Sequence, residues 1–568
     1  MNKLVLSLSV VPALSLLVYA QSIVNRVPRG SGSLCADIPA EEAKTHGDNG
    51  DGTYTNPVIA ADFPDPDVVR VDSIYYMVNT TMFVFPGVTI LKSHDLVNWE
   101  YCGNAVRRFD FSPCYDLDGC NRYGHGQWAT SLKYHNGQYY LLFITLDEGG
   151  FLCTAAKPEG PWTIKHLPKG FYDPGLFFDD DGRIYVAHGY SRIYVTELDT
   201  NFAPISNDSL IFTGDIRRGL EGTHVYKING YYYLYSTYGG LDGFQAAFRS
   251  KNIYGPYEEK VAIRDTTYGV NFGIHQGALI ETQTGQWWTM LFVDNGAFGR
   301  FPSLQPVTWK DGWPMVGVDG KAVVTYKKPD VGREYSATTL PTSDEFDGAT
   351  LGMQWGWNHN PDPTKWSLTE RPGYLRLWTA RVVDSLQKAV NTLTQRMFAY
   401  YSDTLASIAT TKMEFDHMKE GDVAGLAIFQ DPYACVGIKK VNGQNYVMMV
   451  NNGRTIDSLA IKGSTIYLRA SAIHGSGAAQ YYQRNVAPST GDAFFSYSMD
   501  GQSFVTIGNI LHMKFNLDIF TGNKFCLFNY AIMALGGYVD FDWLRTGTEG
   551  ISSLMPENRK MPTGLRQN

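Results

Sequence analysis

The chain repeats a short pattern in which a tight turn leads into a strand rich in aromatic residues. The pattern occurs five times, at 72–76, 136–140, 181–185, 229–233 and 284–288. Asn-Gly and Asp-Gly pairs at several of these turns favour hairpins, because both central residues tolerate positive φ. The alternating β-formers that follow continue a strand. Amphipathic helix signals are scarce, so the pattern predicts an all-β protein built from hairpins.

A second pattern follows several of the hairpins, at 93–99, 155–162 and 250–257. A hairpin followed by a further outer strand, repeated along the chain, is typical of propeller blades. The five copies predict a five-bladed β-propeller over residues 54–327. The alternative is an irregular β-sandwich in which the hairpins recur by coincidence. The order in which both patterns return favours the propeller.

The pattern changes at residue 343, after which short strand-like runs alternate with turn signals to about residue 548. Many short strands of this kind predict a second domain, a β-sandwich over residues 343–548. The remaining segments are predicted to be an N-terminal extension at 21–53, a linker at 328–342 and a polar tail at 549–568.

Composition supports a folded chain with more than one domain. The protein has 568 residues, of which 44% are hydrophobic and 18% charged, so it can bury large cores. The net charge of −8 argues against a nucleic acid partner, since phosphate contacts need clustered Lys and Arg. A neutral polymer suits this charge better.

Residues 1–20 have the organisation of a signal peptide. Lys3 supplies the positive start, an apolar run follows, and Ala20 ends the segment before Gln21. A membrane anchor is the alternative, but the apolar run is short for a span. We therefore expect a secreted, extracellular protein with no membrane partner.

Seven cysteines fit an oxidising compartment loosely. Cys114 and Cys120 are near enough in sequence to close a small loop, but the spacing does not establish the pairing. Asn79 and Asn207 lie in glycosylation sequons. Asn79 falls in an expected buried strand, so Asn207 is the better acceptor.

Three acidic residues lie in motifs that a purely structural role explains poorly. Asp65 lies between Pro64 and Pro66, which we expect to hold the backbone extended. Asp173 and Glu221 each come just before a strand and its hairpin turn, as Asp65 does. Equivalent positions in successive blades converge on the axis of a propeller, so the three carboxylates are predicted to meet. A surface turn is the alternative reading of each motif taken alone.

A cluster of carboxylates suits glycoside hydrolysis. One carboxyl group must donate a proton to the leaving oxygen, and a second must be ionised to activate water. A third carboxylate beside the acid raises the pKa of the acid by repulsion between like charges.

The motifs resemble those of glycoside hydrolase family 43. The stretch 56–99 with its Pro-Asp-Pro motif, Asp173-Pro174, Glu221-Gly222-Thr223-His224 and 274–279 follow the family's order. Residues 344–348 and 358–362 resemble the concanavalin-like sandwich appended to many xylan-active members.

The resemblance implies a five-bladed propeller and inversion at the anomeric carbon. It implies that Asp65 is the general base, that Glu221 is the general acid, and that Asp173 raises the pKa of Glu221 and orients it. The two catalytic carboxyl groups would then lie roughly 6.5–9.5 Å apart. No cofactor is expected to be required.

Five further residues are candidates for the sugar pocket. The resemblance places His275 on the central axis, where it would bind a calcium or sodium ion or support the acid; a hydrogen-bonded core histidine is the alternative. Arg300 could bind sugar hydroxyls or hold Asp65 ionised. Trp128 and Phe85 could form walls of the pocket, with core packing as their alternative, and Tyr172 could shape the entrance.

The family includes α-L-arabinofuranosidases, β-xylosidases and endo-arabinanases. Many of its β-xylosidases carry Trp in the segment that here reads 82–87 and has none. We therefore favour release of arabinofuranosyl units from arabinoxylan by a monomer, with β-xylosidase or bifunctional activity as the alternative. A non-catalytic xylan-binding propeller is the alternative from another class.

Overall fold

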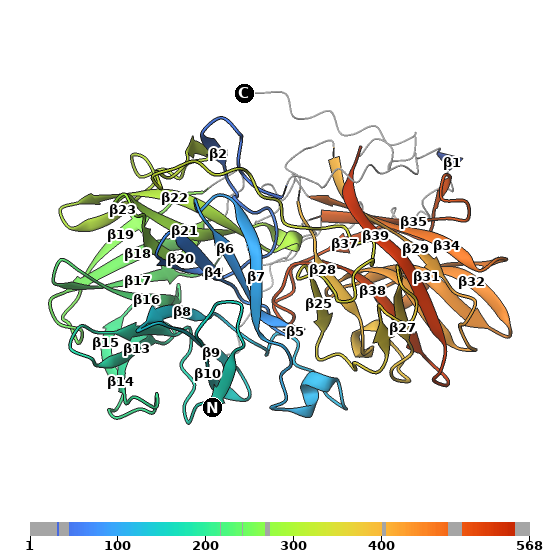
Figure 1. The fold of residues 1–568 in the computed structure, drawn as a ribbon, viewed down its shortest axis with the longest axis horizontal. Helices are drawn as coiled ribbons and strands as arrows, with labels where there is room; N and C mark the ends of the chain where they lie inside the picture. Colours follow the sequence, from blue (N-terminus) through green and yellow to red (C-terminus); the bar gives the residue numbers. More distant parts are fainter. Residues whose placement is uncertain are drawn as a thin grey trace, which may run out of the picture.

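The computed structural model of the protein is all-β (Figure 1). It describes residues 31–32, 45–215, 217–240, 242–266, 273–399, 405–474 and 491–550. The expected signal peptide and most of the expected tail lie outside these residues. Across the described part there is no α-helix, and no helix is long and apolar enough to cross a membrane. The short 3-10 helices are η1 (Pro113–Asp116), η2 (Gly296–Phe298) and η3 (Leu386–Lys388).

Five four-stranded antiparallel sheets form a five-bladed propeller, as the hairpin pattern predicts. Blade 1 contains β3 (Asp67–Val71), β4 (Ile74–Val78), β6 (Gly87–Ser93) and β7 (Trp99–Val106). Blade 2 contains β8 (Ser131–His135), β9 (Gln138–Thr145), β10 (Gly149–Ala155) and β11 (Thr163–His166). Blade 3 contains β12 (Gly175–Phe178), β13 (Ile184–His188), β14 (Arg192–Leu198) and β15 (Ser209–Thr213). Blade 4 contains β16 (Leu220–Ile228), β17 (Tyr231–Tyr238), β18 (Phe244–Ser250) and β19 (Glu258–Ile263). Blade 5 contains β20 (Ile274–Glu281), β21 (Trp287–Asp294), β22 (Arg300–Lys310) and β23 (Trp313–Val316).

The first strand of each blade lies innermost. Strands β3, β8, β12, β16 and β20 contact one another in order around the ring, and β20 contacts β3 to complete it. The recurring aromatic runs form the second strand of each blade, where their side chains pack against the neighbouring blade. A hydrophobic cluster fills each of the five gaps between blades. Burial of these side chains is the main force that holds the blades together.

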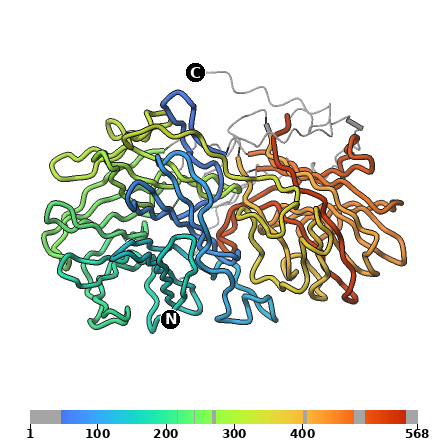
Figure 2. Tube along the Cα trace, viewed as in Figure 1, coloured from blue at the N-terminus to red at the C-terminus, as the bar shows by residue number. Residues whose placement is uncertain are grey.

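The ring is closed near the start and end of the propeller segment. Strand β2 (Thr53–Thr55) pairs with β24 (Thr325–Lys327), and the hydroxyl of Tyr54 donates a hydrogen bond of 2.9 Å to the carbonyl of Leu304. The segment expected to be a linker then runs from the propeller to the second domain (Figure 2). It is anchored on the way, because Val331 and Leu340 are buried in the cluster between blades 5 and 1.

The C-terminal domain is a β-sandwich of two antiparallel sheets. One sheet contains β1 (Ser31–Gly32), β36 (Phe504–Thr506), β35 (Gly491–Ser498), β34 (Thr465–His474), β29 (Leu405–Glu414), β39 (Tyr538–Gly550), β27 (Leu375–Trp378), β26 (Trp366–Ser367) and β37 (Leu511–Met513). The other contains β33 (Arg454–Ile461), β32 (Gln444–Asn451), β31 (Ala434–Val441), β30 (Asp422–Phe429), β38 (Lys524–Ala531), β28 (Leu393–Arg396), β25 (Trp355–Asn358) and β5 (Val84–Phe85). Alternate residues of both sheets, such as Leu426 and Leu468, fill the core between them.

Strand β5 belongs to the propeller by sequence and to the sandwich by pairing. In the chain it follows β4 and precedes β6 of blade 1. In space it pairs antiparallel with β25, with Phe85 opposite Trp357 and Val84 opposite Asn358. The two domains are therefore joined by a shared sheet as well as by the connecting segment.

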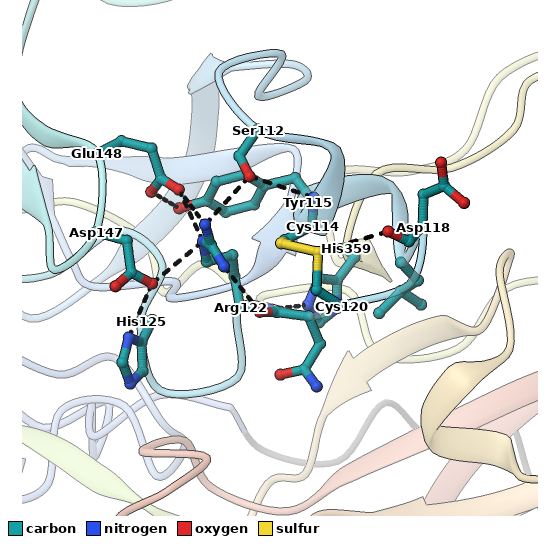
Figure 3. Close-up of a disulfide and its surroundings, with 12 residues drawn as sticks. Ser112, Cys114, Tyr115, Asp118, Cys120, Arg122, His125, Asp147, Glu148 and His359 are labelled. Atoms are coloured by element: carbon teal, nitrogen blue, oxygen red, sulfur yellow. Dashed lines mark hydrogen bonds and ion pairs between the residues drawn. A yellow bond between two sulfur atoms is a disulfide. The ribbon is translucent and has the colours of Figure 1, made fainter.

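A disulfide between Cys114 and Cys120 closes the loop that contains η1 (Figure 3). Arg122 follows this loop and forms an ion pair of 2.7 Å with Glu148, and its backbone N–H donates to the ring of His359 in the sandwich domain. The loop therefore lies at the junction of the two domains.

Candidate active site

The three predicted carboxylates lie at the same end of the innermost strands. Asp65 precedes β3 by two residues, Asp173 precedes β12 by two residues, and Glu221 is the second residue of β16. Because the innermost strands surround the axis, these positions come together at one end of the ring.

The backbone at Asp65 is not extended, so that expectation is corrected. Asp65 and Asp173 have φ values of 54° and 45°, so both are left-handed. Each precedes a proline, which disfavours the right-handed helical region, and Asp is among the few residues that tolerate the left-handed one. The same unusual turn therefore presents a carboxylate in blades 1 and 3.

Asp65 is held by two donors. Its Oδ1 accepts a hydrogen bond of 2.7 Å from Nη1 of Arg300, and its Oδ2 accepts one of 2.6 Å from the hydroxyl of Thr80. The side chain is 7% exposed. A guanidinium and a hydroxyl that both donate to one carboxylate orient it and stabilise its negative charge.

Asp173 and Glu221 are the other two carboxyl groups of the site, and the charge of Glu221 acts on Asp173. Burial raises the pKa of Asp173 well above its usual range, and the charges of Glu221 and Asp65 raise it further. Burial also raises the pKa of Glu221 to about 7, although the hydrogen bond from Tyr172 opposes the shift. The pair therefore retains a proton at neutral pH. Its hydrogen bonds are 3.1 Å from the Tyr172 hydroxyl to Glu221 Oε2 and 3.2 Å from the Gly222 N–H to Asp173 Oδ2.

Glu221 faces an open hollow with a volume of about 590 Å³. Gly239 forms part of its wall, and a Cβ atom there would lie 2.4 Å from Oε1 of Glu221, so only glycine leaves the carboxyl group its room. The other lining residues are mostly polar or charged: Tyr190, Asp215, Arg217, Arg218, Gly240 and Asp242. Asp173 is 5% exposed and does not line the hollow. Glu221 is therefore the member of the pair that can meet a ligand.

The structure brings Trp128, Tyr172 and Arg300 to this site. The centroids of the Trp128 and Tyr172 rings are 6.2 Å apart, and the indole N–H donates to the carbonyl of Gly124. Arg300 contacts Asp65 through Nη1, whereas its buried Nε and Nη2 have no hydrogen-bond partner among the described residues.

His275 is buried at the start of β20, with 3% of its surface exposed. Its Nδ1 lies 3.0 Å from the Thr237 hydroxyl, and its Nε2 lies 3.7 Å from Asp294 without a hydrogen-bond partner. Calcium takes six to eight oxygen ligands. The described residues contain no group of three or more His, Cys, Asp or Glu side chains that could hold a metal ion. This donor set alone does not fit calcium, and the predicted ion at His275 stays a prediction.

Phe85 is not a wall of the pocket, so that interpretation is corrected. Its ring is 1% exposed and packs against Phe109 and Tyr115, with centroids 5.9 and 5.7 Å away. The side chain therefore belongs to the hydrophobic cluster between blades 1 and 2, which is the core-packing alternative.

Sequence reasoning missed Phe520, which the sandwich domain contributes. Its ring centroid lies 4.9 Å from that of Trp128 and 5.1 Å from the guanidinium carbon of Arg300. The sandwich therefore forms part of the site. No local signal marks Phe520, because its loop acquires this role only when the two domains pack together.

A carboxylate held by a guanidinium and a hydroxyl lies at the same end of the ring as two carboxyl groups of raised pKa, one of which borders a sugar-sized hollow. This is the arrangement of a glycoside hydrolase. The model of glycosyl hydrolases family 43 matches residues 54–314, and that of the beta xylosidase C-terminal concanavalin A-like domain matches residues 343–546.

Individual relatives agree with the family models. A beta-xylosidase of Formosa agariphila is 32% identical, over 90% of this chain and 93% of its own. A non-reducing end alpha-L-arabinofuranosidase of Bacteroides ovatus is 32% identical, over 70% of this chain and 78% of its own. The structure of a bifunctional GH43-CE protein of Bacteroides eggerthii is 36% identical with a TM-score of 0.77, and the match covers 89% of this chain and 64% of that longer one. The chain belongs to glycosyl hydrolases family 43 and hydrolyses O-glycosyl bonds.

Proposed function

We propose that the protein releases pentose units from xylan or arabinoxylan by a single displacement that inverts the anomeric carbon. The observation that carries the proposal is the pairing of unlike carboxyl groups at one end of the propeller. Asp65 is bound by Arg300 and Thr80, whereas burial raises the pKa of both Asp173 and Glu221.

The roles follow from what each group touches. Asp65 takes a proton from a water molecule, whose oxygen attacks the anomeric carbon. Glu221 donates its proton to the glycosidic oxygen as the bond to the leaving group breaks. Asp173 orients the Gly222 backbone beside Glu221 and keeps the pair protonated. Trp128, Tyr172 and Phe520 supply aromatic surface for the sugar ring.

We propose α-L-arabinofuranosyl units of arabinoxylan as the group released. The Bacteroides ovatus relative, named as an arabinofuranosidase, supports this proposal. β-Xylosidase activity is the second candidate, favoured about equally by the name of the Formosa agariphila relative and by the description of the C-terminal domain. The two leaving pentoses have similar hydroxyl placement, so one pocket can accept both.

The first prediction tests the roles of Asp65 and Glu221. Wild-type protein is expected to release pentose from wheat arabinoxylan and from aryl pentosides. Glu221→Gln and Asp65→Asn remove the acid and the base, and each should lower kcat on arabinoxylan by about 10²–10⁴-fold. Free arabinose and xylose are measured separately, and proton NMR follows the anomer formed first.

Asp181→Asn is the matched control, because Asp181 is an exposed carboxylate in a hairpin turn. It should retain wild-type kcat. Unchanged pentose release by either site variant would contradict the assigned roles, and a product formed with retention would contradict the single displacement. Arabinan cleavage without action on arabinoxylan would contradict the substrate.

We also propose that the protein is secreted. The Cys114–Cys120 disulfide and the exposed sequon at Asn207 support this location, since both belong to the secretory route. Mass spectrometry of the culture supernatant should find a mature N-terminus at Gln21; cell-associated protein that begins at Met1 would contradict it.

A further inference from the structure

Asp62 lies between the propeller and the sandwich, close behind the catalytic carboxylates. It is 4% exposed. Its Oδ1 accepts a hydrogen bond of 2.9 Å from the backbone N–H of Arg300, and its Oδ2 accepts one of 2.8 Å from the backbone N–H of Gly522. One carboxylate therefore binds backbone groups of both domains.

Both backbone groups belong to residues of the site. Arg300 holds Asp65 through its guanidinium. Gly522 lies two residues after Phe520, whose ring lies against that same guanidinium. Asp62 therefore holds two parts of the site in place. One is Arg300, which binds Asp65, and the other is the loop that carries Phe520.

The packing around Asp62 leaves little freedom to rearrange. A Cβ atom on Gly299 would lie 2.3 Å from Oδ1 of Asp62, and one on Gly522 would lie 2.4 Å from the carbonyl oxygen of Phe298. Gly299 also has a φ of 99°, which side chains rarely adopt. The two domains thus approach through glycines, and the carboxylate lies where both N–H groups point.

Buried cations complete the surroundings of Asp62. Nζ of Lys524, from β38 of the sandwich, lies 3.7 Å from Oδ2, and Nε of Arg396 donates to the Asp62 carbonyl at 2.8 Å. A cavity of about 20 Å³ is lined by Asp62, Lys524 and Thr80 among others. It has room for about one water molecule. Since Thr80 donates to Asp65, the polar surroundings of Asp62 extend to the base itself.

We propose that Asp62 is a positioning residue that couples the sandwich domain to the catalytic base. By binding the Arg300 and Gly522 backbones together, it sets the place of the guanidinium beside Asp65 and of Phe520 beside Trp128. The sandwich is then a working part of the active site, through its loop 516–523. This inference rests on the proposed role of Asp65.

The test is Asp62→Asn, which keeps the size of the side chain but replaces one acceptor oxygen with a donor. One buried N–H, of Arg300 or Gly522, then lacks its acceptor. We expect kcat/KM on an aryl pentoside to fall by about 10–100-fold, as small misplacements of catalytic groups do. The fall should lie mainly in kcat, because a loosened Arg300 no longer holds Asp65 in place to take a proton from water.

Two further measurements separate positioning from general stability. In a double-mutant cycle with Phe520→Leu, the losses in kcat/KM should be clearly less than additive, since both changes act on the same loop. Asp116→Asn is the matched control, because Asp116 also accepts a hydrogen bond across the domain junction, from Asn360, but has no contact with the site. It should leave kcat and KM unchanged.

The outcomes are distinct. If Asp62→Asn lowers only the melting temperature, and folded protein keeps wild-type kcat and KM, the positioning role is overturned. If it does not yield folded protein, Lys524→Gln loosens the same carboxylate from the sandwich side, and an unchanged kcat there is equally decisive. Asp65→Asn tells the two proposals apart: its full activity would refute the proposed function, whereas its inactivity beside a wild-type-like Asp62→Asn refutes only the coupling.

Discussion

Asp173 and Glu221 divide their tasks by how each is enclosed. Asp173 lies behind the hollow, so burial and the charges of Glu221 and Asp65 raise its pKa well above the usual range. The expected action of Asp173 on the pKa of Glu221 stays a prediction. Both carboxyl groups have a raised pKa, but Glu221 alone faces the hollow that receives a leaving group.

The second prediction concerns the pH dependence of this pair. Activity requires a proton on Glu221, so it should decline as the pH rises through and beyond the Glu221 pKa of about 7. Asp173→Asn removes a carboxylate whose negative charge would favour the protonated form of Glu221, so the basic limb of kcat/KM should move to lower pH, by about one unit. The acidic limb should stay in place. The measurement is a pH–rate profile with an aryl pentoside.

Asp181→Asn serves again as the control and should leave both limbs unmoved. A basic limb that stays in place in Asp173→Asn would show that Glu221 holds its proton without help from Asp173.

At this scale the sequence was informative where motifs are local. Asp65 and Asp173 each precede a proline, and Glu221 precedes a hairpin, so their alignment with the strands could be read from the chain. Phe520, Thr80 and Asp62 could not be found in this way. Their roles come from contacts between segments far apart in sequence, and each looks like an ordinary core or loop residue in its own segment.

The strands show the same division between local and distant information. Each blade is built from consecutive strands, so a turn and an aromatic run recur in order and could be recognised. Strand β5 has two residues, and its partner β25 follows the whole propeller in the chain. Nothing near Val84 or Phe85 indicates that partner. The predicted place of Phe85 was wrong because its ring packs against Phe109 and Tyr115, which lie further along the chain.

The third prediction concerns the disulfide-closed loop around η1. Tyr115 lies inside this loop; its ring is fully buried against Phe85 and Phe109, and its hydroxyl donates to Glu148. Replacing Cys114 and Cys120 with Ser frees a short loop in the unfolded chain. By loop-closure entropy, the free energy of unfolding should fall by about 2 kcal/mol. Urea unfolding of both proteins measures the change.

Activity at 25 °C should be retained in this double variant, because residues 114–120 do not line the hollow beside Glu221. Equal unfolding midpoints would contradict a stabilising role for the bond. Four buried cysteines are free in the described residues, and one of them, Cys526, provides a control. Cys526→Ser also replaces a cysteine but breaks no disulfide, so it opens no loop in the unfolded chain.

On the scale of the whole molecule, the two domains form one folding and catalytic unit. They share the β5–β25 sheet edge, the polar contacts of Asp62, and the aromatic cluster of Phe520 and Trp128. The fold class of each domain was predictable from strand patterns, whereas their mutual dependence was not, because patterns within a domain do not report on its neighbours.

The fourth prediction is that the propeller does not function alone. A chain that ends at residue 342 loses the partner of β5 and exposes Val84 and Phe85 at an open sheet edge. It should aggregate or, if soluble, lose nearly all hydrolysis of aryl pentosides. Size-exclusion chromatography and an activity assay test this. A monomeric propeller with wild-type kcat would show that the sandwich is dispensable.

The closure of the propeller ring has a consequence for how the enzyme loses activity. The pair formed by Asp65 and Arg300 joins the first blade to the last, across the one junction where the blades are not continuous in the chain. If blades 1 and 5 separate, Asp65 loses its ion pair with Arg300, while the contacts at the other four blade junctions can persist. Loss of hydrolysis would therefore be an early sign that the propeller ring has opened.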